Sequence, residues 1–257
     1  MKKFMSDLIV RENIKLNDQY FLLKLTATTE LPEMHPGQFA EIKVEDSPST
    51  FLRRPISINL VDRQRNELWL LIQLVGPGTR KLATLLPGNE LNLIYPLGNS
   101  FSYPLHTNSN LLLVGGGVGI APMLFWGAQL ASEGYSPSFL IGGRSAANLL
   151  LLDEFRKYGE VFVTTEDGSE GEKGFVTNHS ILNESFDAIY SCGPTPMMKA
   201  VAAYAAQRSI FCEVSLENTM ACGFGACLCC VTDTVDGHVC VCTEGPVFNI
   251  TKLKWQI

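Results

Sequence analysis

Charged residues are scarce in this chain, and their scarcity limits what the chain binds. Only 18% of the 257 residues are Asp, Glu, Lys or Arg, whereas 46% are hydrophobic. That balance is typical of a compact protein with well-buried cores and excludes a disordered one. The densest basic runs, Lys2–Lys3 and Arg53–Arg54, are only pairs, and the formal charge is −6. These features argue against nucleic acid or an anionic membrane surface as the main partner.

Segments typical of membrane or secreted proteins are also lacking. No charged residue occurs between Leu91 and Ser132, but Pro96, Pro104 and Pro122 interrupt that stretch. It is therefore not the continuous apolar helix of about 20 residues that a membrane span needs. At the N-terminus, Asp7 and the charged residues after it interrupt the apolar run that a signal peptide requires. We expect a cytoplasmic protein.

The first hundred residues lack a helical period and instead contain short strand-like runs. These runs are rich in β-branched, aromatic or alternating apolar residues, and Pro-Gly or Gly-Pro turns separate several of them. They cover residues 19–27, 38–45, 55–61, 67–75 and 90–95, with one short helix over residues 79–86. The pattern predicts an antiparallel β barrel over residues 1–104.

From about residue 108, strand-like and helix-like segments alternate. The predicted strands are 111–116, 138–143, 160–165, 187–193 and 210–216, and the predicted helices are 120–132, 149–158, 175–184 and 195–208. Alternation of this kind predicts a parallel sheet with helices on both faces. The expected fold class is therefore a β barrel plus an α/β domain, the latter over residues 105–215, followed by a small C-terminal module over 216–257.

Six of the eight cysteines lie between Cys222 and Cys242, which is not how disulfides are distributed along a secreted chain. The spacing Cys222-x4-Cys227-x2-Cys230 is that of plant-type ferredoxins, in which thiolates hold a [2Fe–2S] cluster. Glycines at 223 and 225 let the backbone approach the cluster closely. The spacing therefore predicts a [2Fe–2S] cluster, with a fourth thiolate from either Cys240 or Cys242.

The alternative for these cysteines is a structural zinc site. Such sites pair two short-spaced C-x-x-C units or include histidine. Here the spacing is x4 and then x2, and His238 is the only histidine nearby. Iron–sulfur is the better interpretation.

Two turns in the α/β part have the residues of a nucleotide site. The segment LLLVGGGVGIAPM (111–123) predicts a strand, a glycine turn and a helix, and its candidate ligand residues are Gly115, Gly116, Gly117, Val118 and Gly119. Glycines at such a turn let a pyrophosphate reach backbone N–H groups at a helix N-terminus. The second turn, Cys192-Gly193-Pro194, follows another strand and is expected at the same sheet edge. Tight packing explains either turn alone, and Cys192 alone is as readily a buried small residue; the pair favours a nucleotide cleft.

The segment FLRRPISI (51–58) is the candidate phosphate site of the barrel. An arginine fork and a hydroxyl on one strand suit a diphosphate, and Gly76-Pro77-Gly78-Thr79 offers backbone N–H groups to the same ligand. On its own, an arginine pair on a barrel strand is more often a solvated surface feature.

Together these motifs resemble those of the ferredoxin–NADP reductase-like flavoproteins. R-P-I-S followed by G-x-G-T is similar to their FAD motifs, and GGGVGIAP and CGP to their pyridine-nucleotide motifs. With the C-terminal cysteines, the chain resembles the electron-transfer subunits of dihydroorotate dehydrogenase B. In that family the last ligand precedes an acidic-Gly-Pro-Val-Phe segment, which implies Cys242 as the fourth ligand. The resemblance implies FAD contacts at Arg54, Pro55, Ile56, Ser57, Leu71, Ile72, Gln73, Gly78 and Thr79.

The resemblance also implies a function. Nicotinamide would dock between the FAD and the Cys192 turn, where we assign Cys192 a catalytic role. Electrons would pass from FMN in a separate dihydroorotate dehydrogenase catalytic subunit to the cluster, to FAD and to NAD, in a heterotetramer with two copies of each subunit. Two alternatives stay open: a related NAD(P)H–ferredoxin oxidoreductase or sulfide-dehydrogenase-type subunit, and a zinc-stabilised nucleotide-binding module without redox activity. The choice between NAD and NADP stays open: Arg144 after the second strand of the α/β part could meet a 2′-phosphate, but no second basic residue flanks it, and the resemblance favours NAD.

Overall fold

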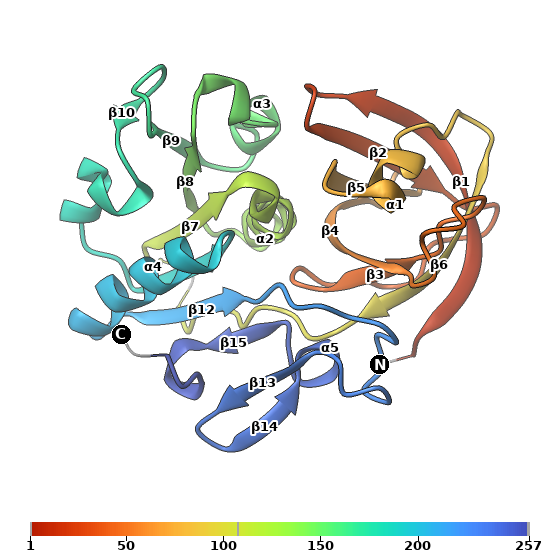
Figure 1. The fold of residues 1–257 in the computed structure, drawn as a ribbon. Helices are drawn as coiled ribbons and strands as arrows, with labels where there is room; N and C mark the ends of the chain where they lie inside the picture. Colours follow the sequence, from red (N-terminus) through yellow and green to blue (C-terminus); the bar gives the residue numbers. More distant parts are fainter. Residues whose placement is uncertain (1, 107, 256–257) are drawn as a thin grey trace.

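The structure is a computed structural model that describes residues 2–106 and 108–255. The first part of the chain forms a closed antiparallel barrel, at the right of Figure 1, with strand order β1-β2-β5-β4-β3-β6. The strands are β1 Phe4–Lys15, β2 Tyr20–Thr26, β3 Phe39–Ile42, β4 Arg54–Asp62, β5 Glu67–Gln73 and β6 Glu90–Leu97. The predicted barrel is confirmed.

Two details of the barrel differ from the prediction. β1 is absent from the predicted strands because charged and apolar residues alternate irregularly in it, and only Leu8 and Val10 of this strand are buried. The helix α1 covers Pro77–Leu82 rather than 79–86. Proline is favoured in the first turn of a helix because its fixed φ suits that position, and Pro77 sets the earlier start.

The second part of the chain forms a seven-stranded sheet in the order β10-β9-β8-β7-β11-β12-β15. Its strands are β7 Leu111–Gly116, β8 Ser138–Gly143, β9 Glu160–Thr165, β10 Glu172–Lys173, β11 Ala188–Cys192, β12 Phe211–Ser215 and β15 Val247–Asn249. The strands from β10 to β12 are parallel, as predicted, whereas β15 runs antiparallel to β12. Alternate residues of β7 enter two different cores, one on each face of the sheet.

The two longest helices confirm the α/β prediction. α2 spans Ile120–Ser132 and α4 spans Thr195–Gln207, on opposite faces of the sheet. The helix predicted over 149–158 is only α3, Leu152–Phe155, because Leu151 has a left-handed φ of 57° and breaks the helix there. The helix predicted over 175–184 is two 3₁₀ turns, Val176–Asn178 and Ser180–Asn183, separated by His179 in an extended conformation. No helix in the described part of the chain is long and apolar enough to cross a membrane.

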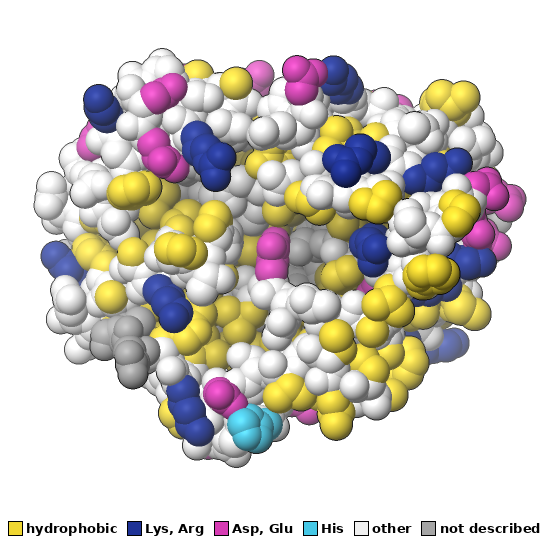
Figure 2. All heavy atoms as spheres, in the orientation of Figure 1, with side chains coloured by type: hydrophobic (Ala, Val, Ile, Leu, Met, Phe, Trp, Pro, Cys, Tyr) yellow, Lys and Arg dark blue, Asp and Glu magenta, His cyan; other side chains and the backbone are white. Residues whose placement is uncertain are grey.

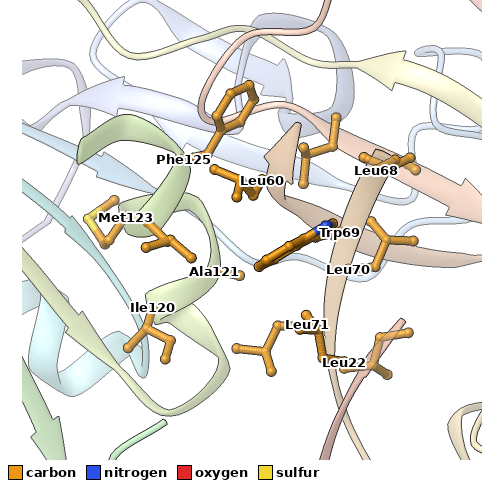
Figure 3. Packing of buried hydrophobic residues seen from close by; sticks show 14 of the residues in the cluster. Leu22, Leu60, Leu68, Trp69, Leu70, Leu71, Ile120, Ala121, Met123 and Phe125 are labelled. Carbon is orange, nitrogen blue, oxygen red and sulfur yellow. The ribbon is translucent and has the colours of Figure 1, made fainter. Parts of the chain in front are cut away.

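A continuous core joins the barrel to the sheet. Figure 3 shows Leu60 and Trp69 of the barrel facing Ala121 and Phe125 of α2, and all four belong to one buried cluster. At the same contact the Asn59 side chain donates a hydrogen bond to the Ala121 carbonyl at 3.3 Å. This packing brings the rim of the barrel to the carboxyl edge of the sheet.

The segment after β12 contains the clustered cysteines and lies below both parts in Figure 1. It comprises a loop, the hairpin β13 (Val231–Thr234) and β14 (Gly237–Cys240), the single turn α5 (Val241–Glu244), and then β15. Because β15 pairs with β12, this segment returns to the large sheet and completes its edge.

Candidate cofactor sites

A cleft of about 630 Å³ lies between the barrel and the sheet. Figure 2 shows the face of the molecule that is hollowed between these two parts. The cleft brings together predicted residues that are far apart in sequence: Gln73 of the barrel, the turn at 116–119, and Gly193 with Pro194. It is the place at which open α/β sheets bind nucleotides.

The two nucleotide turns are in direct contact. A Cβ atom at Gly119 would lie 2.5 Å from the Cys192 carbonyl and from the Gly193 Cα, so only glycine fits there. A Cβ at Gly116 would lie 2.7 Å from the Met197 sulfur. Gly115 faces away from the cleft and packs against Ile120, where a Cβ would lie 2.9 Å from a side-chain carbon. Gly115 therefore serves strand–helix packing, while the others bring backbone to the cleft.

Cys192 lies at the end of β11 with its side chain only 1% exposed. Burial raises the pKa of its thiol far above the ordinary value, so the group is neutral. Cys192 does not line the cleft, whereas Gly193 and Pro194 do. The catalytic role of Cys192 stays a prediction.

On the barrel, the two arginines of the R-R-P-I-S segment separate. Arg53 donates to the carbonyls of Glu41 and Asn92, both at 3.2 Å, and so braces the barrel wall. Arg54 lies instead against Gly78, where a Cβ would be 3.0 Å from its Nε atom. The structure thus brings together the two segments predicted to hold the FAD phosphates, with a space that glycine leaves open.

Other predicted FAD residues have more limited roles. The Thr79 hydroxyl accepts hydrogen bonds from the N–H groups of Val75 and Gly76 at 3.0 and 3.1 Å, so it stabilises its own loop. Leu71 and Ile72 are buried in the hydrophobic cluster and do not line the cleft, whereas Gln73 does. Pro55, Ile56 and Ser57 lie in β4 opposite Glu41, Ala40 and Phe39.

The predicted cluster ligands form two close pairs. The side chains of Cys222 and Cys227 interact with each other, as do those of Cys230 and Cys242. The Cys242 N–H also donates to the Cys230 sulfur at 3.4 Å. Among residues 2–106 and 108–255, no three His, Cys, Asp or Glu side chains are grouped to hold one metal ion. A [2Fe–2S] cluster needs only two thiolates for each of its two irons, so two pairs of thiols suit it.

The loop between the first two ligands is preorganised for a thiolate. Burial opposes ionisation of Cys222, but N–H groups of Phe224, Cys227 and Ala226 directed at its sulfur lower the pKa of this thiol to about 6. Burial raises the pKa of Cys242 to about 12, so this thiol ionises only with the positive charge of a metal beside it. Cys240 also interacts with Cys230, and the preference for Cys242 over Cys240 stays a prediction.

A buried carboxyl group lies beneath this loop. Glu41 is 0% exposed and neither carboxyl oxygen has a hydrogen-bond partner. A Cβ at Gly223 would lie 2.8 Å from the Glu41 Cγ, so the loop rests directly on this side chain. Burial raises the pKa of Glu41 to about 7. The positive charges of Arg53 and Arg54 act to lower this pKa, and Cys222 acts to raise it further. The unpartnered carboxyl therefore lies at the contact between the barrel wall and the cysteine loop.

Several residues of these sites were missed from the sequence, among them three with shifted pKa values. Tyr20 and Glu217 line the cleft, and burial there raises the pKa of both. Glu217 follows β12, and its charge also raises the pKa of Cys192. The third is Glu41, whose only sequence signal is a charge inside an apolar strand, FAEI.

Comparisons with known proteins agree with this geometry. Residues 217–254 match the family model of the iron-sulfur cluster binding domain of dihydroorotate dehydrogenase B, and residues 113–203 match the oxidoreductase NAD-binding domain. The chain is 37% identical over 256 residues to the dihydroorotate dehydrogenase B (NAD(+)) electron transfer subunit of Fusobacterium nucleatum, covering 96% of this chain and 98% of that one. This chain belongs to the family of dihydroorotate dehydrogenase B electron transfer subunits. The subunit of Shouchella clausii is also 37% identical, over 95% of this chain and 96% of its own.

Comparison with solved structures confirms the fold of this chain. The structure of an NADH-dependent reduced ferredoxin-NADP oxidoreductase, studied for flavin-based electron bifurcation, has a TM-score of 0.86 and 28% identity, over 96% of this chain and 90% of that one. A ferredoxin reductase of carbazole 1,9a-dioxygenase has a TM-score of 0.69 and 21% identity, over 82% of this chain and 67% of that one. The predicted resemblance to ferredoxin–NADP reductase-like proteins is confirmed.

Proposed function

We propose that this chain is the electron-transfer half of an NAD+-dependent dihydroorotate dehydrogenase. It would carry electrons from FMN in a separate catalytic subunit to NAD+, using a [2Fe–2S] cluster and FAD of its own. The observation that carries this proposal is the ferredoxin-type cysteine loop resting on the wall of a barrel that also lines a nucleotide cleft. Flavin exchanges hydride with nicotinamide and also gives or takes single electrons, whereas the cluster handles one electron at a time.

In this proposal each part of the chain binds one group. The barrel, residues 1–104, would bind FAD, with Arg54 on the diphosphate beside Gly78 and with β4 and Gln73 along the rest of the molecule. Residues 105–215 would bind NAD(H) at the touching turns 116–119 and 193–194. Residues 216–257 would hold the cluster through Cys222, Cys227, Cys230 and Cys242. All eight cysteines are free thiols, a state that the reducing cytoplasm maintains.

We propose NAD rather than NADP as the nucleotide. Arg144 and Glu166 lie together in the wall of the cleft, after β8 and β9. The Glu166 N–H donates a hydrogen bond to the Gly143 carbonyl at 3.1 Å, and this bond holds Glu166 beside the end of β8. A carboxylate at that position repels the 2′-phosphate of NADP. Turnover with NADPH equal to that with NADH would contradict this preference.

The catalytic subunit would dock on the apolar surface around the cysteine loop. Phe224 and Leu228 of the loop are 51% and 66% exposed, and Phe51 of the segment before β4 is 92% exposed. Met5 of β1 is joined to this surface through Arg53, whose Nη2 atom lies 3.9 Å from the Met5 sulfur. Figure 2 shows apolar side chains gathered over the lower side of the barrel. Exposed apolar patches of this kind mark protein interfaces, and docking here would bring the partner's FMN close to the cluster.

The test is anaerobic co-expression with a dihydroorotate dehydrogenase catalytic chain. We expect a complex of two copies of each chain that contains FAD, FMN and iron and reduces NAD+ with dihydroorotate. Phe51→Asp or Leu228→Asp should abolish co-purification, because each places a charge in the interface. Leu105→Asp is the matched control, since Leu105 is 93% exposed in the segment that joins barrel and sheet. A purified chain without flavin, or dihydroorotate-dependent NAD+ reduction by the partner alone, would refute the proposal.

A further inference from the structure

Asn99, just beyond the end of β6, makes three hydrogen bonds to the segment after Cys242. Its side-chain amide donates to the carbonyls of Thr243 at 3.0 Å and Glu244 at 2.9 Å. Its backbone N–H donates to the Gly245 carbonyl at 2.7 Å. One residue of the barrel thus binds three consecutive residues that lie about 145 positions further along the chain.

These bonds complete the turn that bears Cys242. α5 is a single turn, Val241–Glu244, and the last carbonyl groups of a helix have no partner within it. Such a short helix is not stable alone. Asn99 supplies the missing donors from outside, so the barrel determines where this turn ends and where its cysteine lies.

Two glycines near Asn99, Gly98 and Gly37, are in close contact with the same segment. A Cβ at Gly98 would lie 2.5 Å from the Pro246 Cδ and 3.1 Å from the Gly245 carbonyl oxygen. A Cβ at Gly37 would lie 2.7 Å from a Val247 methyl group and 3.2 Å from the Asn99 carbonyl oxygen. The contact is therefore packed too tightly for the turn to slide along the barrel.

We propose that Asn99 is a positioning residue that fixes Cys242 against the barrel and thereby holds the Cys230–Cys242 side of the cluster at a set place relative to the flavin. This inference rests on the proposed function, because it takes Cys242 as a ligand of the cluster. Glu41 and Leu97 lie beneath the other side of the loop, at Gly223. The barrel wall then supports both thiolate pairs.

The test compares three variants of the holoprotein, purified anaerobically with its partner. Asn99→Asp keeps the size of the side chain but replaces the donating amide with a carboxylate. Asn66→Asp is the matched control, since the Asn66 amide also donates to two backbone carbonyls, of Ala27 at 3.1 Å and Thr29 at 2.8 Å, within the barrel. Cys242→Ser tests the ligand itself. The measurements are iron per flavin, the rate of iron loss to a chelator, and the EPR spectrum of the reduced cluster.

We expect Asn99→Asp to lose iron to the chelator about 10-fold faster than wild type, at the lower end of the 10–100-fold effect typical of residues that orient metal ligands. Its EPR spectrum should shift while its flavin content stays unchanged, and Asn66→Asp should behave as wild type. If Asn99→Asp is not recovered, Asn99→Ala removes the same two side-chain bonds without adding a charge.

The outcomes separate the two proposals. Wild-type iron retention and EPR in the Asn99 variants, with the cluster lost in Cys242→Ser, would overturn the role of Asn99 alone. An intact cluster in Cys242→Ser would instead overturn the ligand assignment on which it rests. Equal loss of iron and flavin in the Asn99 and Asn66 variants would also overturn the inference, because it would show a general loss of stability.

Discussion

The carboxyl group of Glu41 should make the stability of this protein depend on pH, and Glu41→Gln should remove that dependence. Both oxygens are buried without a hydrogen-bond partner, and burial raises the pKa from its ordinary value of 4.5 to about 7. The folded protein therefore binds a proton in a range where the unfolded chain has lost it. The contribution of this carboxyl to the free energy of unfolding is therefore fully present below pH 4.5, and it is lost as the pH rises through 7.

The size of the effect follows from the two pKa values. A shift of one pKa unit is worth about 1.4 kcal/mol, so the full loss above pH 7 is about 3 kcal/mol. Of this, about 2 kcal/mol is lost between pH 5.5 and pH 8. For a protein of this size, 1 kcal/mol changes the melting temperature by about 2–4 °C. Between pH 5.5 and pH 8, the melting temperature of Glu41→Gln should therefore rise by about 4–8 °C relative to that of wild type.

The assay is thermal unfolding of the holoprotein under anaerobic conditions, at one scan rate because cluster loss makes unfolding irreversible. Wild type and Glu41→Gln are compared at several pH values, so that other titrating groups cancel in the difference. Negative charge on a bound cluster would strengthen the effect, because Cys222 already raises the pKa of Glu41. A melting-temperature difference that is constant from pH 5.5 to pH 8 would refute the reasoning.

Three further predictions concern the sites themselves. Cys242→Ser should abolish the EPR signal of the reduced cluster and Cys240→Ser should preserve it, and the reverse result would move the fourth ligand to Cys240. Arg54→Gln should weaken flavin binding by roughly 10–100-fold, which corresponds to the loss of a charge-assisted hydrogen bond. Flavin absorbance per chain measures this loss, and Arg53→Gln should retain flavin. Equal losses in both variants would contradict the separate roles of the two arginines. Gly119→Ala should slow flavin reduction by NADH in stopped-flow experiments without loss of flavin, because a Cβ would lie 2.5 Å from the backbone of the neighbouring turn, and a wild-type rate would show that this contact does not matter.

Much of the fold could be predicted because local patterns determine it. The strands of the barrel and the parallel sheet follow from runs of apolar residues between turn residues, and α2 and α4 from long apolar periods. The short helices were misjudged where one residue interrupts the pattern, such as Leu151 with its positive φ. β1 was missed because most of its residues are exposed or half-exposed, so that hydrophobic alternation does not distinguish it.

The candidate sites divide in the same way. The spacing of Cys222, Cys227 and Cys230 determined the kind of cluster, because the two short intervals along one loop decide which thiolates reach the same irons. The glycines of the nucleotide turn were visible as a pattern of strand, glycines and helix, although the residues that Gly116 and Gly119 approach belong to a distant turn.

Only the tertiary structure decided how these parts join. It separated Arg54 from Arg53, placed Glu41 under Gly223, and bound Asn99 to the turn that carries Cys242. None of these pairings leaves a trace in the local sequence, because each depends on how the barrel, the sheet and the C-terminal segment pack together. The sequence alone determined the chemistry of the cluster; the packing of distant segments decided what surrounds it.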